Sequence, residues 1–304
     1  MKLIFLNGGL ANQIFQYIFY RYAEISFPEE EWVLDDSFFY VHSFHHGYEL
    51  GRVFGLKPKL LSQRFDPEVW EYMIYLKQQG QSMPEIFRKN GNVISMVTEA
   101  DNYVQWNPFD GKVWKVPNDE FLPEILKLPG EVYYHGYWIR PEWFRSIEEQ
   151  IRKDLTFPEL SVGAFDGETA EQCLRNKFWL DLIKSRDITS VHIRRGDYVT
   201  GGIAIDDAWY REQIEKVLLG TCDTQCIVFS DDMEYCKIHR NELGLDLISN
   251  VHYIEDNQNI CAFRDLQLMS HTKRMIIGNS AFSYLAALLN KDAVQILKPQ
   301  SRLL

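Results

Sequence analysis

The order of hydrophobic and polar residues divides the chain into two parts with different patterns. The first thirty residues predict a strand over Leu3–Leu6, a turn over residues 7–9 and a helix over Leu10–Ser26, in which apolar residues recur at helical spacing. Residues 27–130 hold several aromatic segments and few regular periods. Before residue 157 we also predict one strand and two helices, over Glu131–Tyr134, Pro67–Gln79 and Pro141–Leu155.

After Phe157-Pro158, short β-branched runs alternate with helical patterns. Five strands are predicted, over Ile188–Ile193, Gln225–Phe229, Val251–Ile254, Met275–Ile277 and Ala293–Leu297. Four helices are predicted between them, near Asp207–Leu219, Asp232–Leu243, Ile260–Ser270 and Phe282–Leu289. This alternation is typical of a parallel, doubly wound α/β sheet, in which ligands bind beyond the carboxyl ends of the strands. We therefore expect two domains, residues 1–156 and 157–304.

Composition places the chain among ordinary globular proteins. Hydrophobic residues make up 46% and charged residues 25% of 304 residues, which excludes disordered and fibrous classes. Aromatic residues reach 14%. Most will fill the core, although Trp and Tyr also form flat platforms for sugar rings. The net charge of −11 argues against a nucleic-acid groove or an anionic membrane surface.

Cysteine usage and hydropathy indicate a reducing cytoplasm. The five cysteines are odd in number and form no CxxC pair, so a disulfide framework is not expected. The apolar run at the N-terminus is too short for a signal peptide, and no stretch of about 18 apolar residues occurs. We expect a cytoplasmic protein with no membrane span, and at most peripheral contact with the inner face of the plasma membrane.

Two arginines follow the first strand of the second part, within the segment His192-Ile193-Arg194-Arg195-Gly196-Asp197-Tyr198. A guanidinium group is planar, always charged and matches phosphate oxygens bidentately. Arg194 and Arg195 therefore suit a diphosphate clamp. The alternative is a surface cluster of ion pairs.

A second anion-binding corner is predicted where Gly278-Asn279-Ser280-Ala281-Phe282-Ser283 opens a helix. Free backbone N–H groups and the positive end of the helix dipole suit an anion there. Taken alone, ordinary N-capping by Ser280 is the simpler interpretation. Two such corners at one sheet edge favour a phosphate ligand.

Acidic residues offer a competing metal site. Asp231-Asp232 follows the second of these strands, and paired carboxylates suit Mg²⁺ or Mn²⁺. The two are adjacent rather than spaced, and Ser-Asp before a helix is a common cap, so we favour a structural role. Asp265, in a predicted helix, is either solvated or directed at a ribose or base. No zinc, P-loop or nucleophile-elbow pattern occurs.

The first loop, Gly8-Gly9-Leu10-Ala11-Asn12-Gln13, lets backbone approach a ligand closely and offers Asn12 and Gln13 as hydrogen-bond donors. A plain glycine turn into a helix is the alternative. The loop is not a GxGxxG fingerprint, which argues against an NAD-linked dehydrogenase.

Together these motifs resemble the inverting α-1,2-fucosyltransferases of bacteria and animals. The segments that carry the resemblance span the chain in order: GGLANQIFQY at 8–17, GYEL at 47–50, GYW at 136–138, HIRRGDY at 192–198, FSDD at 229–232, DLQLMS at 265–270 and GNSAFS at 278–283. Three departures from the family pattern are Ala11, Ala281 and Tyr284-Leu285.

The resemblance implies a GT-B architecture, with two Rossmann-like domains facing across a cleft, the acceptor side in residues 1–156 and GDP-fucose in 157–304. It implies inverting transfer from GDP-β-L-fucose to the 2-hydroxyl of a galactose or similar hexose, with no metal and no further cofactor. Arg194 would hold the β-phosphate with support from Arg195, and Asp265 would contact the guanosine. The remaining donor-binding residues implied by the matched motifs are Gly9, Asn12, His192, Asp231, Asn279, Ser280, Phe282 and Ser283.

The acceptor hydroxyl needs a proton acceptor, for which Asp197 is the first candidate, followed by Glu49 and His46. Asp197 could instead orient Arg195. The partner is expected to be a glycan, such as an oligosaccharide or a lipid-linked polysaccharide repeat. Transfer of another GDP-sugar, and a non-catalytic sugar-binding relative, remain alternatives.

Overall fold

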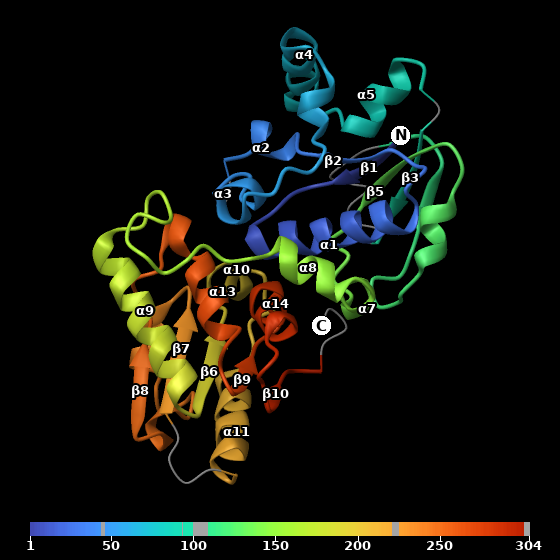
Figure 1. The fold of residues 1–304 in the computed structure, drawn as a ribbon. Helices are drawn as coiled ribbons and strands as arrows, with labels where there is room; N and C mark the ends of the chain where they lie inside the picture. The colour runs from blue at the N-terminus through green and yellow to red at the C-terminus, as the bar shows by residue number, and fades with distance from the viewer. Residues whose placement is uncertain (44–45, 93, 100–108, 221–224, 301–304) are drawn as a thin grey trace. The chain divides into compact units, whose positions relative to one another are not determined.

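A computed structural model describes residues 1–43, 46–92, 94–99, 109–220 and 225–300 (Figure 1). The chain forms two compact units that divide between Thr156 and Phe157. Each unit is built on its own parallel sheet. No helix in the described ranges has the length and apolar character needed to cross a membrane.

The N-terminal unit contains a five-stranded sheet in the order β2-β1-β5-β3-β4, with every neighbouring pair parallel. Its strands are β1 (Lys2–Phe5), β2 (Trp32–Asp35), β3 (Ile94–Thr98), β4 (Val113–Lys115) and β5 (Glu131–His135). Its helices are α1 (Leu10–Ser26), α2 (Phe38–Val41), α3 (Leu50–Phe54), α4 (Pro67–Gln78), α5 (Met83–Lys89), α7 (Pro141–Ser146) and α8 (Glu148–Asp154), with 3₁₀ turns η1 (Leu61–Arg64) and η2 (Pro123–Lys127).

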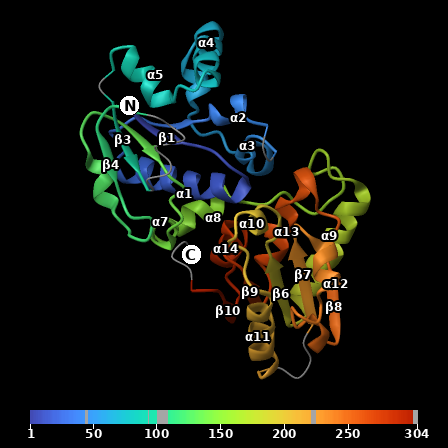
Figure 2. The same ribbon diagram turned by 180° about the vertical axis from the view of Figure 1, so that it is seen from behind.

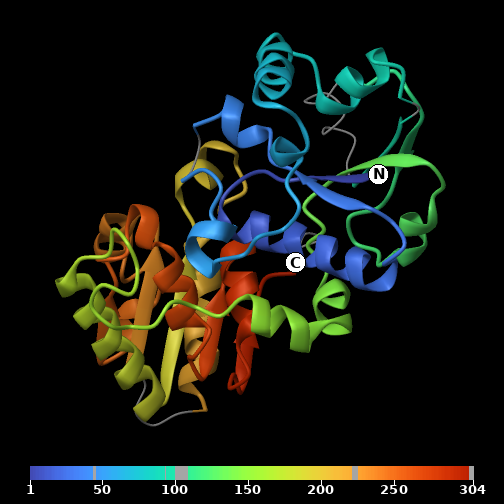
Figure 3. The same ribbon diagram turned by 45° about the horizontal axis from the view of Figure 1, so that its top comes forward.

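Helices cover both faces of this sheet. Helix α1 runs along one face (Figure 3), where Phe19 stacks on Trp138 with ring centroids 4.2 Å apart. The other face packs under α4 and α5, whose Trp70, Met73 and Ile86 join one buried cluster with residues of β1, β2, β3 and β5. Burial on both faces explains why these strands lack a clean alternation of apolar and polar residues.

The C-terminal unit confirms the predicted parallel sheet. Its strand order is β10-β9-β6-β7-β8. The strands are β6 (Ile188–Ile193), β7 (Gln225–Ser230), β8 (Asn250–Tyr253), β9 (Arg274–Ile277) and β10 (Gln295–Leu297). The helices are α9 (Ala170–Ser185), α10 (Gly196–Thr200), α11 (Asp207–Leu218), α12 (Met233–Ile238), α13 (Phe263–Met269) and α14 (Ala281–Leu289), with η3 (Leu245–Leu247) and η4 (Asn259–Cys261).

This sheet is also covered on both sides, as a doubly wound fold requires. Residues of α11 and α12, including Tyr210, Ile214 and Cys236, pack on Val191 and Ile193 of β6. Helices α9, α13 and α14 lie on the opposite face, and turning the molecule by 180° brings α11 and α12 forward (Figure 2). Because β6, β7 and β9 run parallel to one another, their carboxyl ends lie at the same edge of the sheet.

The helices differ from the sequence prediction at several places, of which three are instructive. The helix predicted over Pro141–Leu155 is two helices, because the backbone leaves helical geometry at Ile147, with φ −135° and ψ 28°. The helix predicted to reach Leu243 ends at Ile238. Helix α9 was not predicted, because its buried residues (Cys173, Asn176 and Ile183) do not form a continuous apolar stripe.

The cysteines of the described ranges remain thiols inside the fold. Cys173, Cys226, Cys236 and Cys261 are all buried and unbridged, while Cys222 lies outside the described residues.

Candidate functional site

The carboxyl edge of the C-terminal sheet gathers the residues predicted to hold a donor. Arg194 directly follows β6, and Asp231 directly follows β7. Ser280 precedes α14 in the turn after β9. Short connections at this edge keep these side chains close to the strands that position them.

The Arg194 guanidinium lies between two carboxylates. Its Nε and Nη2 donate to one oxygen, Oδ1 of Asp197, at 3.1 and 2.7 Å, and its Nη1 lies 3.0 Å from Oδ2 of Asp231. Asp197 is 67% exposed and Asp231 is 26% exposed. One carboxylate oxygen thus occupies the edge of Arg194 on which a phosphate oxygen would bind, and it belongs to the more exposed partner.

Arg195 points elsewhere. Its backbone N–H donates to Oδ1 of Asp231 at 2.8 Å, and its guanidinium lies 3.5 Å from the centroid of the Tyr235 ring. Asp197 therefore pairs with Arg194, and the alternative in which it orients Arg195 is wrong. A Cβ at Gly196 would lie 2.5 Å from Oδ2 of Asp231, so a larger residue there would displace the carboxylate that binds Arg194.

Asp231 and Asp232, the two aspartates after β7, already bind other groups of the protein. Asp232 accepts the backbone N–H of Tyr235 at 3.0 Å and caps α12, which confirms the structural interpretation of this residue. Asp231 binds Arg194 and the backbone of Arg195. Over the described ranges, no group of three or more His, Cys, Asp or Glu side chains converges in a way that could hold a metal ion.

His192 is the last but one residue of β6 and is buried. Burial, assisted by the positive charge of Arg194, lowers its pKa to about 3, so the ring is neutral at physiological pH. Its Nδ1 has no hydrogen-bond partner among the described residues. The ring lies 5.9 Å from that of Phe282. A buried nitrogen without a partner beside Arg194 is available to a bound ligand.

The turn that precedes α14 caps the N-terminus of this helix. Ser280 accepts the N–H of Phe282 at 3.3 Å, which confirms ordinary N-capping. Ser283 is fully buried, and its hydroxyl donates to the Ser280 carbonyl at 3.3 Å. The Ser283 hydroxyl therefore points into the fold, and the prediction that Ser283 lines the donor stays a prediction. Asn279 donates to the Ile203 carbonyl at 2.7 Å and fixes the turn.

Asp265 is held by a chain of amide side chains. Its Oδ1 accepts from Asn257 at 2.8 Å, and Asn257 exchanges two hydrogen bonds with Asn176, at 2.7 and 2.8 Å. Burial, assisted by the nearby Asp256 charge and opposed by the Asn257 hydrogen bond, raises the pKa of Asp265 to about 7. The neighbouring Arg264 is fully buried and pairs with Glu168 at 2.7 Å.

In the N-terminal unit, Gln13 organises the glycine loop. It is fully buried; its amide donates to the carbonyls of Gly8 and Gly47 at 2.9 and 2.8 Å, and its oxygen accepts the Glu49 N–H at 2.9 Å. The prediction that Gln13 donates to a ligand is therefore wrong. Asn12 stays partly exposed one residue earlier, and its side chain lies beside Gly8, whose φ is +76°.

Glu49 caps the N-terminus of α1. Gly9 is the N-cap residue of this helix and has no side chain to cap it. The Glu49 carboxylate accepts the Leu10 N–H and pairs with Arg52 at 2.5 Å; burial raises its pKa, and both contacts oppose that shift. Glu49 is thus a buried helix-capping carboxylate, while His46 is exposed in the preceding turn.

Sequence reasoning missed Glu99, which follows β3. Its Oε2 accepts the N–H groups of Tyr137 and Trp138 at 2.7 and 2.8 Å. Trp138 has a φ of 57°, unusual for a residue with a side chain. Burial raises the pKa of Glu99 to about 7, against the lowering effect of the two N–H donors and Arg140. In the sequence, the only sign of this role is a carboxylate placed directly after a strand. The aromatic residues around β3 hide the strand itself, so the position of Glu99 could not be recognised.

Comparison with known proteins decides the family. Residues 117–302 match Glycosyl transferase family 11. The chain belongs to this family. It is 26% identical to an alpha-1,2-colitosyltransferase of Escherichia coli over 93% of this chain and 86% of that protein. It is 24% identical to the O-antigen biosynthesis glycosyltransferase WbnK of Escherichia coli over 94% and 89%.

More distant similarity extends to animal enzymes and to solved structures. Galactoside alpha-(1,2)-fucosyltransferase 1 of Alouatta belzebul is 23% identical over 64% of this chain and 51% of that protein. The structure of NodZ alpha-1,6-fucosyltransferase soaked with GDP-fucose matches with a TM-score of 0.54, covering 99% of this family 11 chain and 96% of that chain at 14% identity. The two parallel sheets thus form a GT-B fold, as the resemblance implied.

Proposed function

We propose that this family 11 glycosyltransferase moves L-fucose from GDP-β-L-fucose to the 2-hydroxyl of a galactose or similar hexose in a glycan, with inversion and without a metal ion. The observation that carries the proposal is the Arg194 guanidinium, whose Nε and Nη2 converge on one exposed carboxylate oxygen. The α-1,2 linkage is supported by the names of the colitosyl and galactoside fucosyl relatives.

Leaving-group stabilisation follows from this arrangement. The β-phosphate of GDP gains negative charge as the bond to the sugar breaks, and preorganised donors aimed at that charge lower the barrier. We propose that the phosphate replaces Asp197 on Arg194, while Asp231 keeps the guanidinium in place from its other side. Apart from the Phe282 N–H, which Ser280 accepts, the backbone N–H groups at the start of α14 would supply a second set of donors.

Asp197 then has a second role. Once the phosphate has displaced it, its exposed carboxylate is free to accept the proton of the acceptor hydroxyl. One in-line displacement at the anomeric carbon forms the new C–O bond, breaks the bond to GDP and inverts the configuration. Glu49, which caps α1 and pairs with Arg52, is less available for this role.

A second donor has a specific observation in its favour. The relative that is 26% identical over 93% of this chain is a colitosyltransferase, and colitose lacks one ring hydroxyl of fucose. A site that hydrogen-bonds that hydroxyl rejects the sugar that lacks it, whereas a site that leaves it unbound accepts both. We therefore keep GDP-colitose as the alternative donor on the same phosphate site.

The deciding experiment supplies the chain with GDP-fucose or GDP-colitose and a panel of galactose-terminated acceptors, and determines the linkage of each product. An α-1,2-linked fucosyl product formed at higher kcat/KM than the colitosyl product supports the proposal. A preference for GDP-colitose assigns the alternative donor. Absence of both transfer and donor hydrolysis would show a non-catalytic sugar-binding relative. A dehydrogenase is tested separately by absorbance change with NADH.

A further inference from the structure

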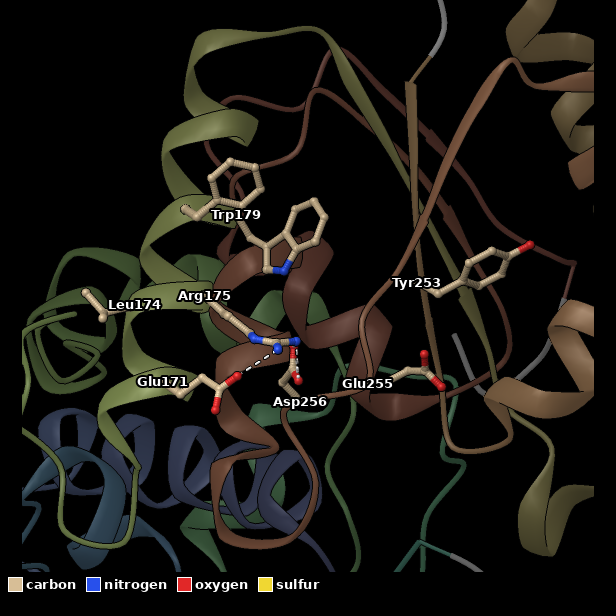
Figure 4. A pocket seen from close by; sticks show the side chains of 8 residues that line it. Glu171, Leu174, Arg175, Trp179, Tyr253, Glu255 and Asp256 are labelled. Carbon is tan, nitrogen blue, oxygen red and sulfur yellow. Dashed lines mark hydrogen bonds and ion pairs between the residues drawn. The ribbon is translucent and has the colours of Figure 1, made fainter.

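A pocket of about 640 Å³ lies in the C-terminal unit between helix α9 and the chain that follows strand β8 (Figure 4). Eight residues line it: Glu171, Leu174, Arg175, Phe178, Trp179, Tyr253, Glu255 and Asp256. None of them belongs to the residues predicted to hold the nucleotide donor. The pocket is therefore a feature that the proposed transfer reaction leaves unexplained.

Aromatic and aliphatic groups form much of its wall. Leu174 and Phe178 are each 59% exposed, one helical turn apart on α9. Trp179 lies closer to the pocket interior (Figure 4), with its ring 5.2 Å from that of His252 in β8. The buried side of α9 is formed by other residues, so this second apolar face is not needed to pack the helix.

The charged side chains that line the pocket give it a net negative charge. Three carboxylates and one guanidinium line it. Arg175 is bound to Glu171 at 2.7 Å and to both oxygens of Asp256 at 3.1 and 3.2 Å. Glu255 pairs with Lys237 outside the lining set. This balance disfavours a phosphate or a second nucleotide, and it suits a neutral ligand whose hydroxyl groups donate to carboxylate oxygens.

We propose that this pocket is a second carbohydrate-binding site, which holds a neutral segment of a glycan chain. The apolar face of a sugar ring would stack on Trp179, and its hydroxyls would donate to Glu255 and Asp256. Identifying the occupant as part of the acceptor glycan rests on the proposed function. A glycan bound at two places gains affinity without new contacts at the reacting sugar.

Binding is tested with lactose and with a longer galactose-terminated oligosaccharide, using saturation-transfer NMR and calorimetry on the full chain. The Trp179→Ala variant should raise the Kd of the longer oligosaccharide about fivefold to tenfold, the effect of one aromatic contact. Trp114→Ala is the matched control, because Trp114 is an exposed tryptophan of the N-terminal unit. Glu255→Gln removes an exposed carboxylate and should also weaken binding if Trp179→Ala fails to fold.

Kinetics separate this inference from the proposed function. In Trp179→Ala we expect the KM of the longer acceptor to rise by a similar factor, with kcat and the KM of lactose unchanged. If wild type transfers no sugar, the proposed function fails, while oligosaccharide binding that depends on Trp179 still supports the pocket. Unchanged binding in both pocket variants overturns the proposal. So does a dimer in sedimentation analysis that Phe178→Ser dissociates, because a second copy would then cover this face.

Discussion

The Asn257 side chain donates a 2.8 Å hydrogen bond to Oδ1 of Asp265, and its orientation is set from the other end of a buried chain. Arg264 can only donate, and it pairs with Glu168. Glu168 accepts from the Asn176 amide at 3.3 Å, which turns the Asn176 amide nitrogen toward the Asn257 carbonyl. The Asn257 N–H groups must then face Asp265, and this favours its ionised carboxylate. We propose that the guanine base of the donor binds this carboxylate.

Replacing Asn257 with alanine should therefore weaken GDP binding. Loss of the hydrogen bond to the ionised carboxylate raises the pKa of Asp265 above about 7, its value in the intact fold. If the guanine base binds ionised Asp265 as proposed, GDP affinity should fall as the pH drops through 7 in wild type, and at higher pH in Asn257→Ala. We expect about a tenfold higher Kd near neutral pH, measured by calorimetry across pH 6–9.

Asn250→Ala is the control for this pair, because Asn250 is exposed in the same unit. Inosine diphosphate lacks the exocyclic amine of guanine. If Asp265 accepts a hydrogen bond from that amine, Asn257→Ala should weaken the binding of inosine diphosphate less than that of GDP. Equal losses for both nucleotides, with no shift in the pH profile, would assign Asn257 a purely structural role.

Replacing Arg194 with alanine should lower transfer about 10²–10³-fold, the usual effect of removing one donor that stabilises charge in the transition state. Thermal unfolding should change little, because the side chain is 31% exposed and its partners are surface carboxylates. Arg211→Ala removes a comparably exposed, ion-paired arginine of α11 and should leave turnover unchanged. Transfer by Arg194→Ala within a few-fold of wild type would refute the phosphate assignment.

The proposed metal-independent transfer predicts full activity in EDTA. Asp232→Ala should lower stability by about 1 kcal/mol through loss of the α12 cap and leave turnover unaltered, because the side chain serves only that helix. Asp231→Asn should lower turnover, since its carboxylate holds Arg194 in place. Activity that chelator removes and Mn²⁺ restores would instead make the two aspartates ligands.

Sequence reasoning found the C-terminal unit more readily than the N-terminal one for a physical reason. Strands β6, β7 and β9 are short apolar runs separated by turn residues, and charged or hydroxyl side chains that could bind a ligand follow each of them in the sequence. In residues 27–130, strands β2 and β3 are buried on both faces and lie between aromatic helices, so no period separates strand from helix. Helix α9 has a Thr169–Gln172 capping box that a search for caps would have found.

The positions of the candidate residues could be predicted from the sequence, whereas their hydrogen-bond partners could not. Arg194, Asp231 and Ser280 are recognisable from their positions after strands. That Gln13 faces inward, or that Ser283 lies under the helix turn, depends on packing that no local pattern encodes. Glu99 and Asn257 were missed for the same reason, because each gains its importance from a segment distant in sequence.

Glu99 predicts a pH-dependent stability. In the folded chain its pKa is about 7, above the ordinary value of 4.5, so the folded state keeps a proton that the unfolded chain loses. Stability should fall as the pH rises from about 4.5 to 7. Glu99→Gln removes this loss while its carbonyl still accepts both N–H groups, and should raise Tm by about 2–4 °C at pH 8 but not at pH 4.5. Glu71→Gln, at an exposed position, is the control; a lower Tm for Glu99→Gln at pH 8 would contradict the assignment.

Asp197 is the residue for which two roles can be separated by one substitution. Asparagine keeps the shape of Asp197 but accepts protons poorly, so a general base at this position predicts a loss of about 10²–10⁴-fold in kcat. GDP should bind at least as tightly, because the phosphate no longer competes with a carboxylate for Nε and Nη2 of Arg194. Calorimetric titration of GDP beside the kinetics distinguishes the outcomes: lower kcat with undiminished GDP affinity supports the base, and weaker GDP binding would mean that Asp197 positions Arg194 for the phosphate. Near-normal transfer would exclude both roles and leave Glu49 as the next residue to replace.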